Sequence, residues 1–329
     1  RQQRVKIGDT FSEWQSNIKG VPQGSILGPL LFNIFINDFL YFKMNSQIYN
    51  YADDNTLCYV SKDTNEIKIK LEEDCLKAVE WFRSNNMKAN ADKFQLMIIN
   101  ENADNLQVQI NGNLIKSQLS ISILGIEIDH KLNFHPHIET LCNQAGKQIN
   151  ALKRINHYLD KKCKTILYNS YVSSNFNYCP LVWLFSGKTS LGKLEKTNKR
   201  ALRFVASDKY ASYEELCQSE AQLSINKRCI KTVAIQMFKI KRQTCPSYVT
   251  ELFNQRTLHY DVRDNDQFKL PKFNTVTYGR KSIRYYGPKL WNQIPTEIKR
   301  NNSIKSFKLA VTSWLSNLEL NDLHLIEFQ

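Results

Sequence analysis

Two adjacent aspartates, Asp53 and Asp54, follow a short apolar stretch that ends at Tyr51. Successive side chains of a strand point to opposite faces, so two neighbouring carboxylates can approach one cation only at a turn. A second apolar stretch, which continues to Val60, predicts that turn between two strands. Mg²⁺ prefers oxygen ligands, typically one or two carboxylates with substrate phosphates. The pair therefore indicates a site for Mg²⁺ or Mn²⁺ beside a nucleotide, and the alternative is an ordinary Asp-rich hairpin turn.

A glycine-containing loop, residues 20–25, precedes the aspartates. Gly20 and Gly24 allow backbone conformations that other residues disfavour, and Pro22 stiffens the segment between them. Such a loop would present the Gln23 amide to a base or sugar edge. As an isolated pattern, the loop could also be a simple entry into a helix.

A helix is expected next, opened by Ser25 or by Gly28-Pro29 and running to about Phe42. The run from Ile26 to Phe42 is strongly apolar, but polar residues interrupt it too often for a lipid-spanning helix. The pattern therefore predicts a buried core helix and no membrane segment.

The remaining elements of the first 130 residues predict a mixed α and β structure. Alternating side chains predict a hairpin over residues 1–19, and strand patterns recur at 93–99 and 121–128. Asn111-Gly112 favours a two-residue type I′ turn, because both central residues need positive φ. Residues 65–82 predict a helix with one apolar face. That face contains Ile69, Leu71, Leu76, Val79 and Phe82.

Residues beyond 133 follow a helical pattern. The apolar positions of the first helix are Ile138, Leu141, Ala145, Ile149, Leu152 and Ile155. A helix after Ser190 separates an apolar side, with Leu194, Ala201 and Val205, from a cationic side. The cationic side contains Lys193, Lys196, Arg200 and Arg203. It could follow a phosphate backbone or be a solvated face. A last helix is expected near 303–318.

Charge is distributed unevenly along the chain, whose net charge is +14. Residues 1–130 hold 13 Lys and Arg against 16 Asp and Glu, whereas residues 131–329 hold 32 against 15. A half this basic favours a polyanionic partner, although charge that only maintains solubility has the same composition. The basic, aromatic segment 278–286 could stack on unpaired bases, form an interface or belong to a local core. Eight scattered cysteines without C-x-x-C spacing indicate reduced intracellular thiols.

The motifs occur in an order that resembles a known family. Residues 20–32, then 36–38, then 51–54 are similar to the reverse transcriptases of non-LTR retrotransposons, particularly jockey-like animal elements. The similarity continues at 90–93, which resembles the family's lysine motif, and at 124–129, which resembles its primer grip.

The resemblance implies an α+β fold built as a right-hand polymerase. Residues 1–130 would be a partial reverse transcriptase palm, 131–210 a mainly helical thumb-like region, and 211–329 a basic C-terminal extension. The resemblance is close over the first of these regions and loose over the last.

The resemblance also implies roles for single residues. Asp53, supported by Asp54, would bind the catalytic Mg²⁺ in two-metal nucleotidyl transfer. Lys93 would protonate or stabilise pyrophosphate, and the alternative is a solvated lysine at a strand edge. Leu124 and Gly125 would form the primer grip. The nucleotide and template would meet Gly20, Pro22, Gln23, Gly24, Ser25 and Tyr51, and the nucleic-acid backbone would meet Lys193, Lys196, Arg200 and Arg203.

One ligand of the family's metal site has no counterpart. The family uses another Asp, on a strand before the glycine-containing loop, and that strand would lie ahead of Arg1. Asp9 does not replace it, because Gly8-Asp9 is expected at a hairpin tip. We therefore expect that the chain alone does not polymerise.

The expected function is part of an RNA-directed DNA polymerase that takes an RNA template, a DNA primer and deoxynucleoside triphosphates. The family's priming on chromosomal DNA implies action in the nucleus. A non-catalytic nucleic-acid-binding remnant or host-retained module is the alternative. A group II intron maturase or telomerase-like protein shares the palm arrangement, but the tail after 210 fits it less well. The sequence leaves the oligomeric state open.

Overall fold

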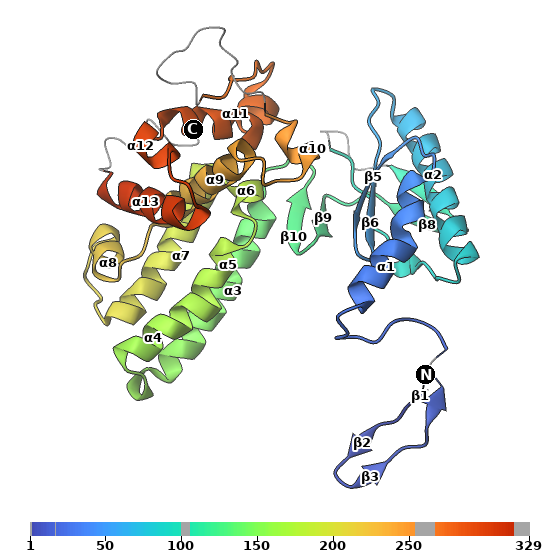
Figure 1. The fold of residues 1–329 in the computed structure, drawn as a ribbon, viewed down its shortest axis with the longest axis horizontal. Helices are drawn as coiled ribbons and strands as arrows, with labels where there is room; N and C mark the ends of the chain where they lie inside the picture. The colour runs from blue at the N-terminus through green and yellow to red at the C-terminus, as the bar shows by residue number, and fades with distance from the viewer. Residues whose placement is uncertain (1, 17, 100–105, 254–266, 319–329) are drawn as a thin grey trace. The chain divides into compact units, whose positions relative to one another are not determined.

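Figure 1 shows the computed structural model, which describes residues 2–16, 18–99, 106–253 and 267–318. The chain forms two compact units, Arg1–Leu119 and Ser120–Gln329. The expected boundary at 130 therefore differs from the boundary between the units. None of the described helices is long and apolar enough to cross a membrane.

The first unit begins with a small hairpin, as predicted. Strand β2 (Lys6–Ile7) pairs with β3 (Thr10–Phe11), and β1 (Gln2–Gln3) pairs with β4 (Gln15–Ser16). Gly8, with a φ of +60°, stands in the turn beside Asp9.

Helix α1 (Gly28–Ile36) and the 3-10 helix η1 (Asn37–Tyr41) occupy the apolar run. The Ser25 hydroxyl accepts a hydrogen bond from the Gly28 N–H at 3.0 Å. The prediction of a buried core helix is wrong for most of this segment, because only Gly28, Ile36 and Phe39 are buried. Ile36 and Phe39 pack on one flank against a second helix, and the described residues leave the other flanks uncovered.

Strands β5 (Gln47–Tyr51) and β6 (Asp54–Cys58) form an antiparallel hairpin. The return strand ends at Cys58 and does not reach Val60. Helix α2 (Thr64–Ser84) follows, close to the predicted bounds. Two of its predicted inward positions, Ile69 and Leu76, are exposed.

Helix α2 has two buried flanks instead of one apolar face. Ala78 and Trp81 pack with Ile36 and Phe39 in one core, while Val79 packs against a second core. That second core contains Leu106, Val108 and Ile110. Because the buried flanks lie elsewhere on the helix, Ile69 and Leu76 remain in contact with solvent.

The end of the first unit contains a 3-10 turn and a hairpin. Residues 93–99 were expected to be a strand, but the structure shows the 3-10 helix η2 (Ala91–Lys93) and a single bridge between Leu96 and Ser117. Strands β7 (Gln107–Ile110) and β8 (Asn113–Lys116) pair as predicted. Asn111 and Gly112, with φ of +47° and +82°, form the expected turn.

The second unit opens with a hairpin where one strand was expected. Strands β9 (Ser120–Ile123) and β10 (Ile126–Asp129) are antiparallel. Leu124 and Gly125 both have positive φ, +49° and +76°, and therefore reverse the chain.

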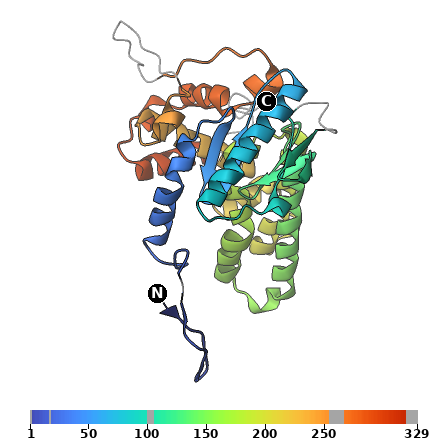
Figure 2. The same cartoon turned by 90° about the vertical axis from the view of Figure 1, so that its right-hand side faces the viewer.

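Helix α3 (His135–Arg154) confirms the predicted helical face, since its apolar positions are buried through Leu152. Ile155 lies beyond the helix and is exposed. The elements that follow are the 3-10 helix η4 (Asn156–Tyr158), α4 (Lys161–Leu167), the π-helix η5 (Tyr168–Ser173), α5 (Ser174–Asn177), α6 (Pro180–Trp183) and α7 (Lys188–Ala206). Helices α3 and α7 pack against each other (Figures 1 and 2).

The C-terminal helices complete the same core. They are α8 (Tyr213–Ser219), α9 (Ile225–Lys241), α10 (Ser247–Thr250), the π-helix η6 (Val276–Arg280), α11 (Ile283–Gln293), α12 (Thr296–Lys299) and α13 (Ile304–Asn317). Helix α13 confirms the predicted last helix. Within the segment 278–286, Tyr286 is buried, Tyr285 packs against Phe273, and Tyr278 is exposed. Residues on both sides of 210 share one hydrophobic core, so 210 is not a boundary between compact units.

A series of side-chain hydrogen bonds connects residues on both sides of position 210. Arg228 on α9 donates to the Tyr168 hydroxyl at 2.7 Å, and the Tyr168 hydroxyl donates to Oδ1 of the Asn198 side chain at 2.8 Å. Asn198 Nδ2 donates to the Tyr213 hydroxyl at 2.8 Å, which donates to the Glu195 carboxylate. A half-buried cation and a half-buried carboxylate are thus joined through three neutral side chains, and these hydrogen bonds replace the water that both charged groups lose.

Candidate active site

The turn between β5 and β6 consists of Ala52 and Asp53, and Tyr51 pairs with Asp54. Ala52 has a φ of +52°, an uncommon conformation for a residue with a Cβ. Asn50 Nδ2 donates to the Ala52 carbonyl at 2.9 Å, and Asn55 Nδ2 donates to the Asp53 carbonyl at 3.1 Å. The two amides also bond each other at 2.8 Å. The predicted turn is therefore present and braced by an asparagine pair that the motif did not reveal.

The pairing register places Asp54 on the solvent side of the hairpin. Because faces alternate along a strand, Asp54 shares its face with Tyr49 and Tyr51, both exposed. Ile48 and Leu57 lie on the opposite, half-buried face.

Both carboxylates of the pair are exposed, Asp53 in the turn and Asp54 as the first residue of β6. Within the described ranges, no hydrogen bond or ion pair engages either side chain. Their oxygens suit a hard divalent cation. Across the described parts of the chain, no group of three or more His, Cys, Asp or Glu side chains is placed to hold a metal ion.

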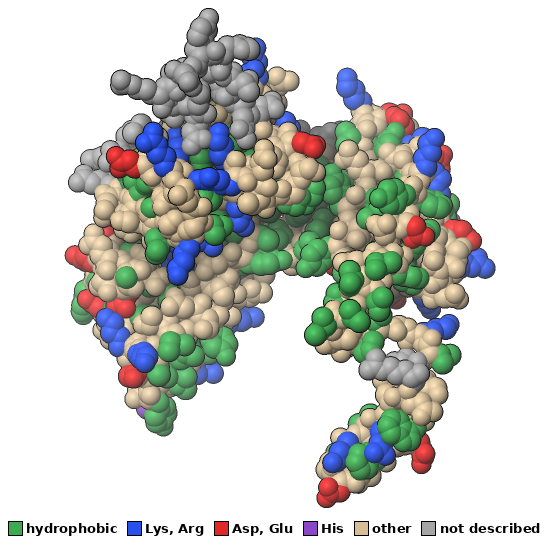
Figure 3. Space-filling model, viewed as in Figure 1, with side chains coloured by type: hydrophobic (Ala, Val, Ile, Leu, Met, Phe, Trp, Pro, Cys, Tyr) green, Lys and Arg blue, Asp and Glu red, His purple; other side chains and the backbone are tan. Residues whose placement is uncertain are grey.

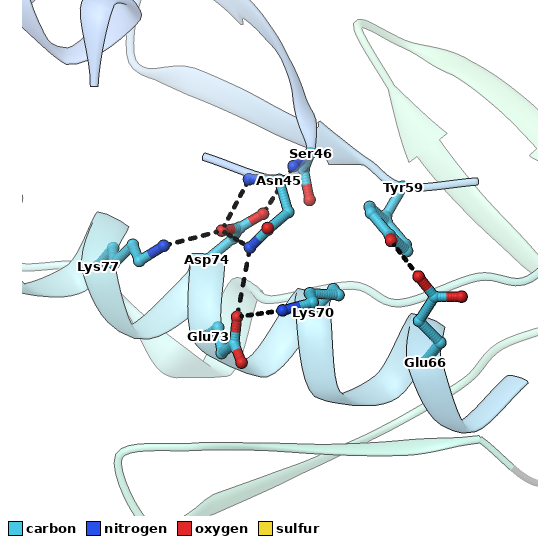
Figure 4. Close-up of polar contacts among 8 residues, drawn as sticks. All are labelled: Asn45, Ser46, Tyr59, Glu66, Lys70, Glu73, Asp74 and Lys77. Atoms are coloured by element: carbon cyan, nitrogen blue, oxygen red, sulfur yellow. Dashed lines mark hydrogen bonds and ion pairs between the residues drawn. The ribbon is translucent and has the colours of Figure 1, made fainter. Parts of the chain in front are cut away.

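Asp74 on α2 anchors the start of the hairpin (Figure 4). Its fully buried carboxylate accepts hydrogen bonds from the backbone N–H groups of Asn45 at 3.1 Å and Ser46 at 2.7 Å. Lys77 Nζ lies 3.5 Å from the same carboxylate. Burial raises the pKa of Asp74, but hydrogen bonds from Ser46 and Asn45 outweigh burial, so the net pKa lies below the usual value.

Glu66, two turns earlier on α2, holds the segment that leaves the hairpin (Figure 4). Its carboxylate accepts hydrogen bonds from the Tyr59 hydroxyl at 2.7 Å and from the Ser61 hydroxyl. These hydrogen bonds, first that from Ser61, lower the pKa of Glu66. One helix therefore fixes both ends of the hairpin that carries the aspartates. No local pattern in the sequence signalled the anchor at Asp74, because its partners Asn45 and Ser46 lie 29 and 28 residues earlier in the chain.

The glycine-containing loop has the conformation that its residues predicted. Gly20 and Gly24 have φ of +79° and +78°. The Ser25 N–H donates to the Pro22 carbonyl at 3.2 Å, which closes the loop, and Gln23 is exposed. The loop belongs to the same unit as Asp53, but no hydrogen bond between described residues joins loop and turn.

Lys93 lies in the turn η2 and is exposed, so the strand-edge alternative is wrong in its secondary structure. Asn90 caps this turn by accepting from the Asp92 N–H at 3.1 Å. The described residues show no hydrogen bond from the Lys93 side chain to either aspartate of the turn.

Leu124 and Gly125 form the β9–β10 turn of the second unit. The Leu124 carbonyl accepts a hydrogen bond from the Tyr178 hydroxyl at 2.6 Å. The proposed primer-grip pair is thus held at a defined hairpin tip.

The cationic side of α7 is only partly available for another partner. Lys193 Nζ lies 2.9 Å from Glu139 on α3, and half-buried Arg203 donates to the Ala211 carbonyl at 3.3 Å. Lys196 and Arg200 are exposed. Of the four predicted cations, Lys196 and Arg200 are therefore the better candidates for contact with a nucleic-acid backbone.

The family model for "Reverse transcriptase (RNA-dependent DNA polymerase)" matches residues 6–128. The match ends within β10, so it includes the β9–β10 hairpin that packs with the second unit.

Curated proteins are similar over a longer range. The chain is 25% identical over 221 residues to a probable RNA-directed DNA polymerase from transposon BS of Drosophila melanogaster, covering 63% of this chain and 24% of that protein. It is 27% identical over 208 residues to the RNA-directed DNA polymerase from mobile element jockey of the same species, covering 59% and 23%. For the jockey polymerase of Drosophila funebris the identity is 29% over 223 residues, covering 61% and 24%.

The chain spans about a quarter of the length of these relatives. Each alignment is longer than the first unit, so the similarity includes residues of the second. No solved structure matches the chain significantly. Residues 6–128 thus match a reverse transcriptase family, and the chain is similar, as its motifs predicted, to the RNA-directed DNA polymerases of the BS and jockey mobile elements.

Proposed function

We propose that this chain contributes the carboxylate turn of an RNA-directed DNA polymerase that extends a DNA primer on an RNA template. The observation that carries the proposal is the pair of exposed, unengaged carboxylates at Asp53 and Asp54, on a hairpin that α2 holds at both ends. The reverse transcriptase match over the same residues supports it.

Asp53 and Asp54 would hold Mg²⁺, or Mn²⁺ in its place, because both ions prefer carboxylate oxygens. When bound, such ions activate a primer 3′-hydroxyl and stabilise the leaving pyrophosphate. The asparagine pair Asn50 and Asn55 fixes the turn, so that the carboxylates need little reorganisation during the reaction.

The other matched residues would position the substrates. Gly20, Pro22, Gln23, Gly24 and Ser25 would line the deoxynucleoside triphosphate and its template base, with Tyr51 beside them. Lys93, whose ammonium group is exposed, would stabilise or protonate pyrophosphate. Leu124 and Gly125 would contact the primer, and Lys196 and Arg200 the nucleic-acid backbone.

Two carboxylates are few for a pair of Mg²⁺ ions that share ligands. We therefore propose that polymerisation needs a further carboxylate beyond the described residues, and that the 329-residue chain alone does not extend a primer. We also propose that the protein acts in the nucleus.

The test is primer extension on an RNA template by the longest natural protein that contains this sequence. Asp53→Ala should reduce extension at least a hundredfold, and Asp9→Ala, an exposed Asp at a hairpin tip, should leave it unchanged. Extension unaffected by Asp53→Ala would refute the metal role. Tight nucleic-acid binding without any extension would instead favour the non-catalytic module.

A separate readout uses the 329-residue chain itself. Mn²⁺ binding, followed by electron paramagnetic resonance, should weaken on Asp53→Ala and not on Asp9→Ala. Equal Mn²⁺ affinity in both variants would contradict the assignment even if the chain never extends a primer.

A further inference from the structure

Three packed helices of the second unit lack acidic side chains altogether. Helices α9, α11 and α13 carry nine Lys and Arg residues, five on α9 and two each on the others, and no Asp or Glu. Helices α3 and α7 of the same unit, in contrast, each contain a glutamate, Glu139 and Glu195. Figure 3 shows Lys and Arg side chains gathered over α9, α12 and α13.

Helices α9 and α13 pack in opposite directions, and cations mark both ends of their contact. Near the start of α9, Lys227 Nζ donates to the Leu318 carbonyl at the end of α13, at 3.1 Å. Just past the end of α9, Arg242 donates to the Asn301 carbonyl before α13, at 2.8 Å. Each side chain uses one donor in these bonds, and both have further donors available.

Lys231 and Lys308 lie between these ends. Lys231 on α9 is half-buried, and Lys308 on α13 is exposed. Burial lowers the pKa of Lys231, and the positive charges of Lys308 and Arg228 lower it further. No carboxylate among the described residues forms an ion pair with Lys227, Lys231, Arg242 or Lys308, which together form the cationic seam.

Glu214 acts on Lys227 only through a longer-range Coulombic attraction, without an ion pair. Like charges held together without an ion-paired carboxylate raise the energy of a surface, and an anion relieves that cost. The 17 residues of α9 extend about 25 Å, a length that faces several phosphates of one strand. We propose that the cationic seam is a track that binds the sugar–phosphate backbone of a nucleic-acid strand. The track is separate from α7, where Glu139 and the Ala211 carbonyl already engage two of the four predicted cations.

This inference rests on the proposed function only for the identity of the strand. The charge pattern defines a phosphate track, and the polymerase assignment makes template RNA or target DNA the strand that it meets. Binding of nucleic acid is measured without metal or nucleotide and in the Asp53→Ala background. A failure of the phosphate-track proposal can therefore be distinguished from a failure of the proposed catalytic role.

The test measures binding of the 329-residue chain to a labelled 20-nucleotide RNA and to a 20-base-pair DNA duplex by fluorescence anisotropy at several salt concentrations. The double variant Lys231→Gln/Lys308→Gln should raise Kd about tenfold near 0.1 M salt. It should also reduce the slope of log K against log salt by about 1.4 for the RNA or about 1.8 for the duplex. Loss on one probe alone supports the track and identifies its strand.

Two control variants make the result specific. Lys68→Gln/Lys88→Gln changes the net charge equally at two exposed lysines of the first unit and should leave Kd within twofold. Lys231→Arg/Lys308→Arg keeps the charge and should bind like the unmodified chain.

Stability distinguishes lost contacts from lost folding. Because neutralisation removes repulsion, the Tm of the Gln variant should equal or exceed that of the unmodified chain. If its Tm falls, Lys308→Gln alone, at an exposed position, should still lower the salt slope by about 0.7 to 0.9. A seam variant with the same Kd and salt slope as the first-unit control on both probes would overturn the proposal.

Discussion

The two units divide chemistry and packing unequally. The first carries the aspartate turn and the glycine-containing loop, but its buried apolar side chains form two small clusters, one around Trp81 and one around Val108. In the second, 35 of the residues that the structure describes are buried in one continuous core, and few motifs are recognisable. The residues that could do chemistry are therefore easiest to identify in the first unit, where a few polar anchors hold the local structure. Most of the buried apolar contacts that stabilise the protein lie in the second unit, where the sequence shows only helical periodicity.

The largest expected effect tests the core of the second unit. Phe307 is fully buried and stacks on Phe238, with ring centroids 4.2 Å apart. Phe307→Ala should cost about 3 to 5 kcal/mol of unfolding free energy, from lost burial and the cavity left behind. Chemical denaturation with hydrogen exchange in α9 and α13 measures it. Leu309→Ala, at an exposed residue of the same helix, should cost under about 0.5 kcal/mol, and equal costs would contradict the single core.

The next effect tests the polar anchor of the first unit. Asp74→Ala leaves the N–H groups of Asn45 and Ser46 without their acceptor, which should cost about 2 to 3 kcal/mol. Hydrogen exchange should rise in β5 and β6, and extension by the natural protein should fall. Glu80→Ala, at an exposed carboxylate of the same helix that lies 3.9 Å from Arg83, provides the control. Unchanged exchange in β5 would show that the small apolar cluster alone holds the hairpin.

A smaller effect is an opposite dependence of stability on pH in the two units. The pKa of Asp74 is lowered from its usual 3.8, so its contribution is present above that pH and is lost as pH falls through the folded-state pKa. Burial raises the pKa of Glu195 above its usual 4.5 despite hydrogen bonds from Tyr213 and the N–H groups of Asn226 and Ile225. Its contribution is therefore greatest below pH 4.5 and declines as pH rises through the folded-state pKa.

Hydrogen exchange across pH 3 to 7 measures both trends. Protection of β5 should fall on the acid side, and Asp74→Asn should remove that fall. Protection at the start of α9 should fall on the alkaline side of pH 4.5, and Glu195→Gln should remove it. The same direction in both places would contradict the assignment of opposite pKa shifts.

The smallest effect concerns the exposed apolar positions of α2. Ile69→Ser and Leu76→Ser should change stability by less than about 0.5 kcal/mol, because both side chains already contact solvent. Thermal unfolding of the 329-residue chain tests this. A loss above 1 kcal/mol would indicate a burial that the described residues do not show.

The sequence predicted local structure well where interactions between residues close in the chain determine the conformation. Asn111-Gly112, Gly20 and Gly24 have the positive φ that their types favour, and the period of α3 identifies its buried face. The prediction from sequence failed where tertiary contacts determine which side chains are buried. Ile69 and Leu76 fit a helical period, but the two clusters that pack on α2 lie on other flanks.

The site shows the same division. The motif located Asp53 and Asp54, yet their support by Asp74 depends on a contact 29 residues away in the chain, which no local pattern encodes. Leu124-Gly125 was expected within a strand, because apolar residues on both sides concealed a two-residue turn. On α7, sequence spacing could not show that Glu139 engages Lys193.

The half-buried Glu195 has a consequence for the order in which parts of the protein can pack during synthesis. Its carboxylate accepts the first N–H groups of α9, from Ile225 at 3.1 Å and Asn226 at 2.8 Å, so a residue of α7 completes the start of a helix thirty positions later. During synthesis, Glu195 joins the chain before any of these partners, and its carboxylate stays hydrated until Tyr213 and the first turn of α9 emerge. Closure of this part of the protein therefore waits for residues beyond 226, and a chain released at 210 would leave the Glu195 carboxylate in water, without its donors.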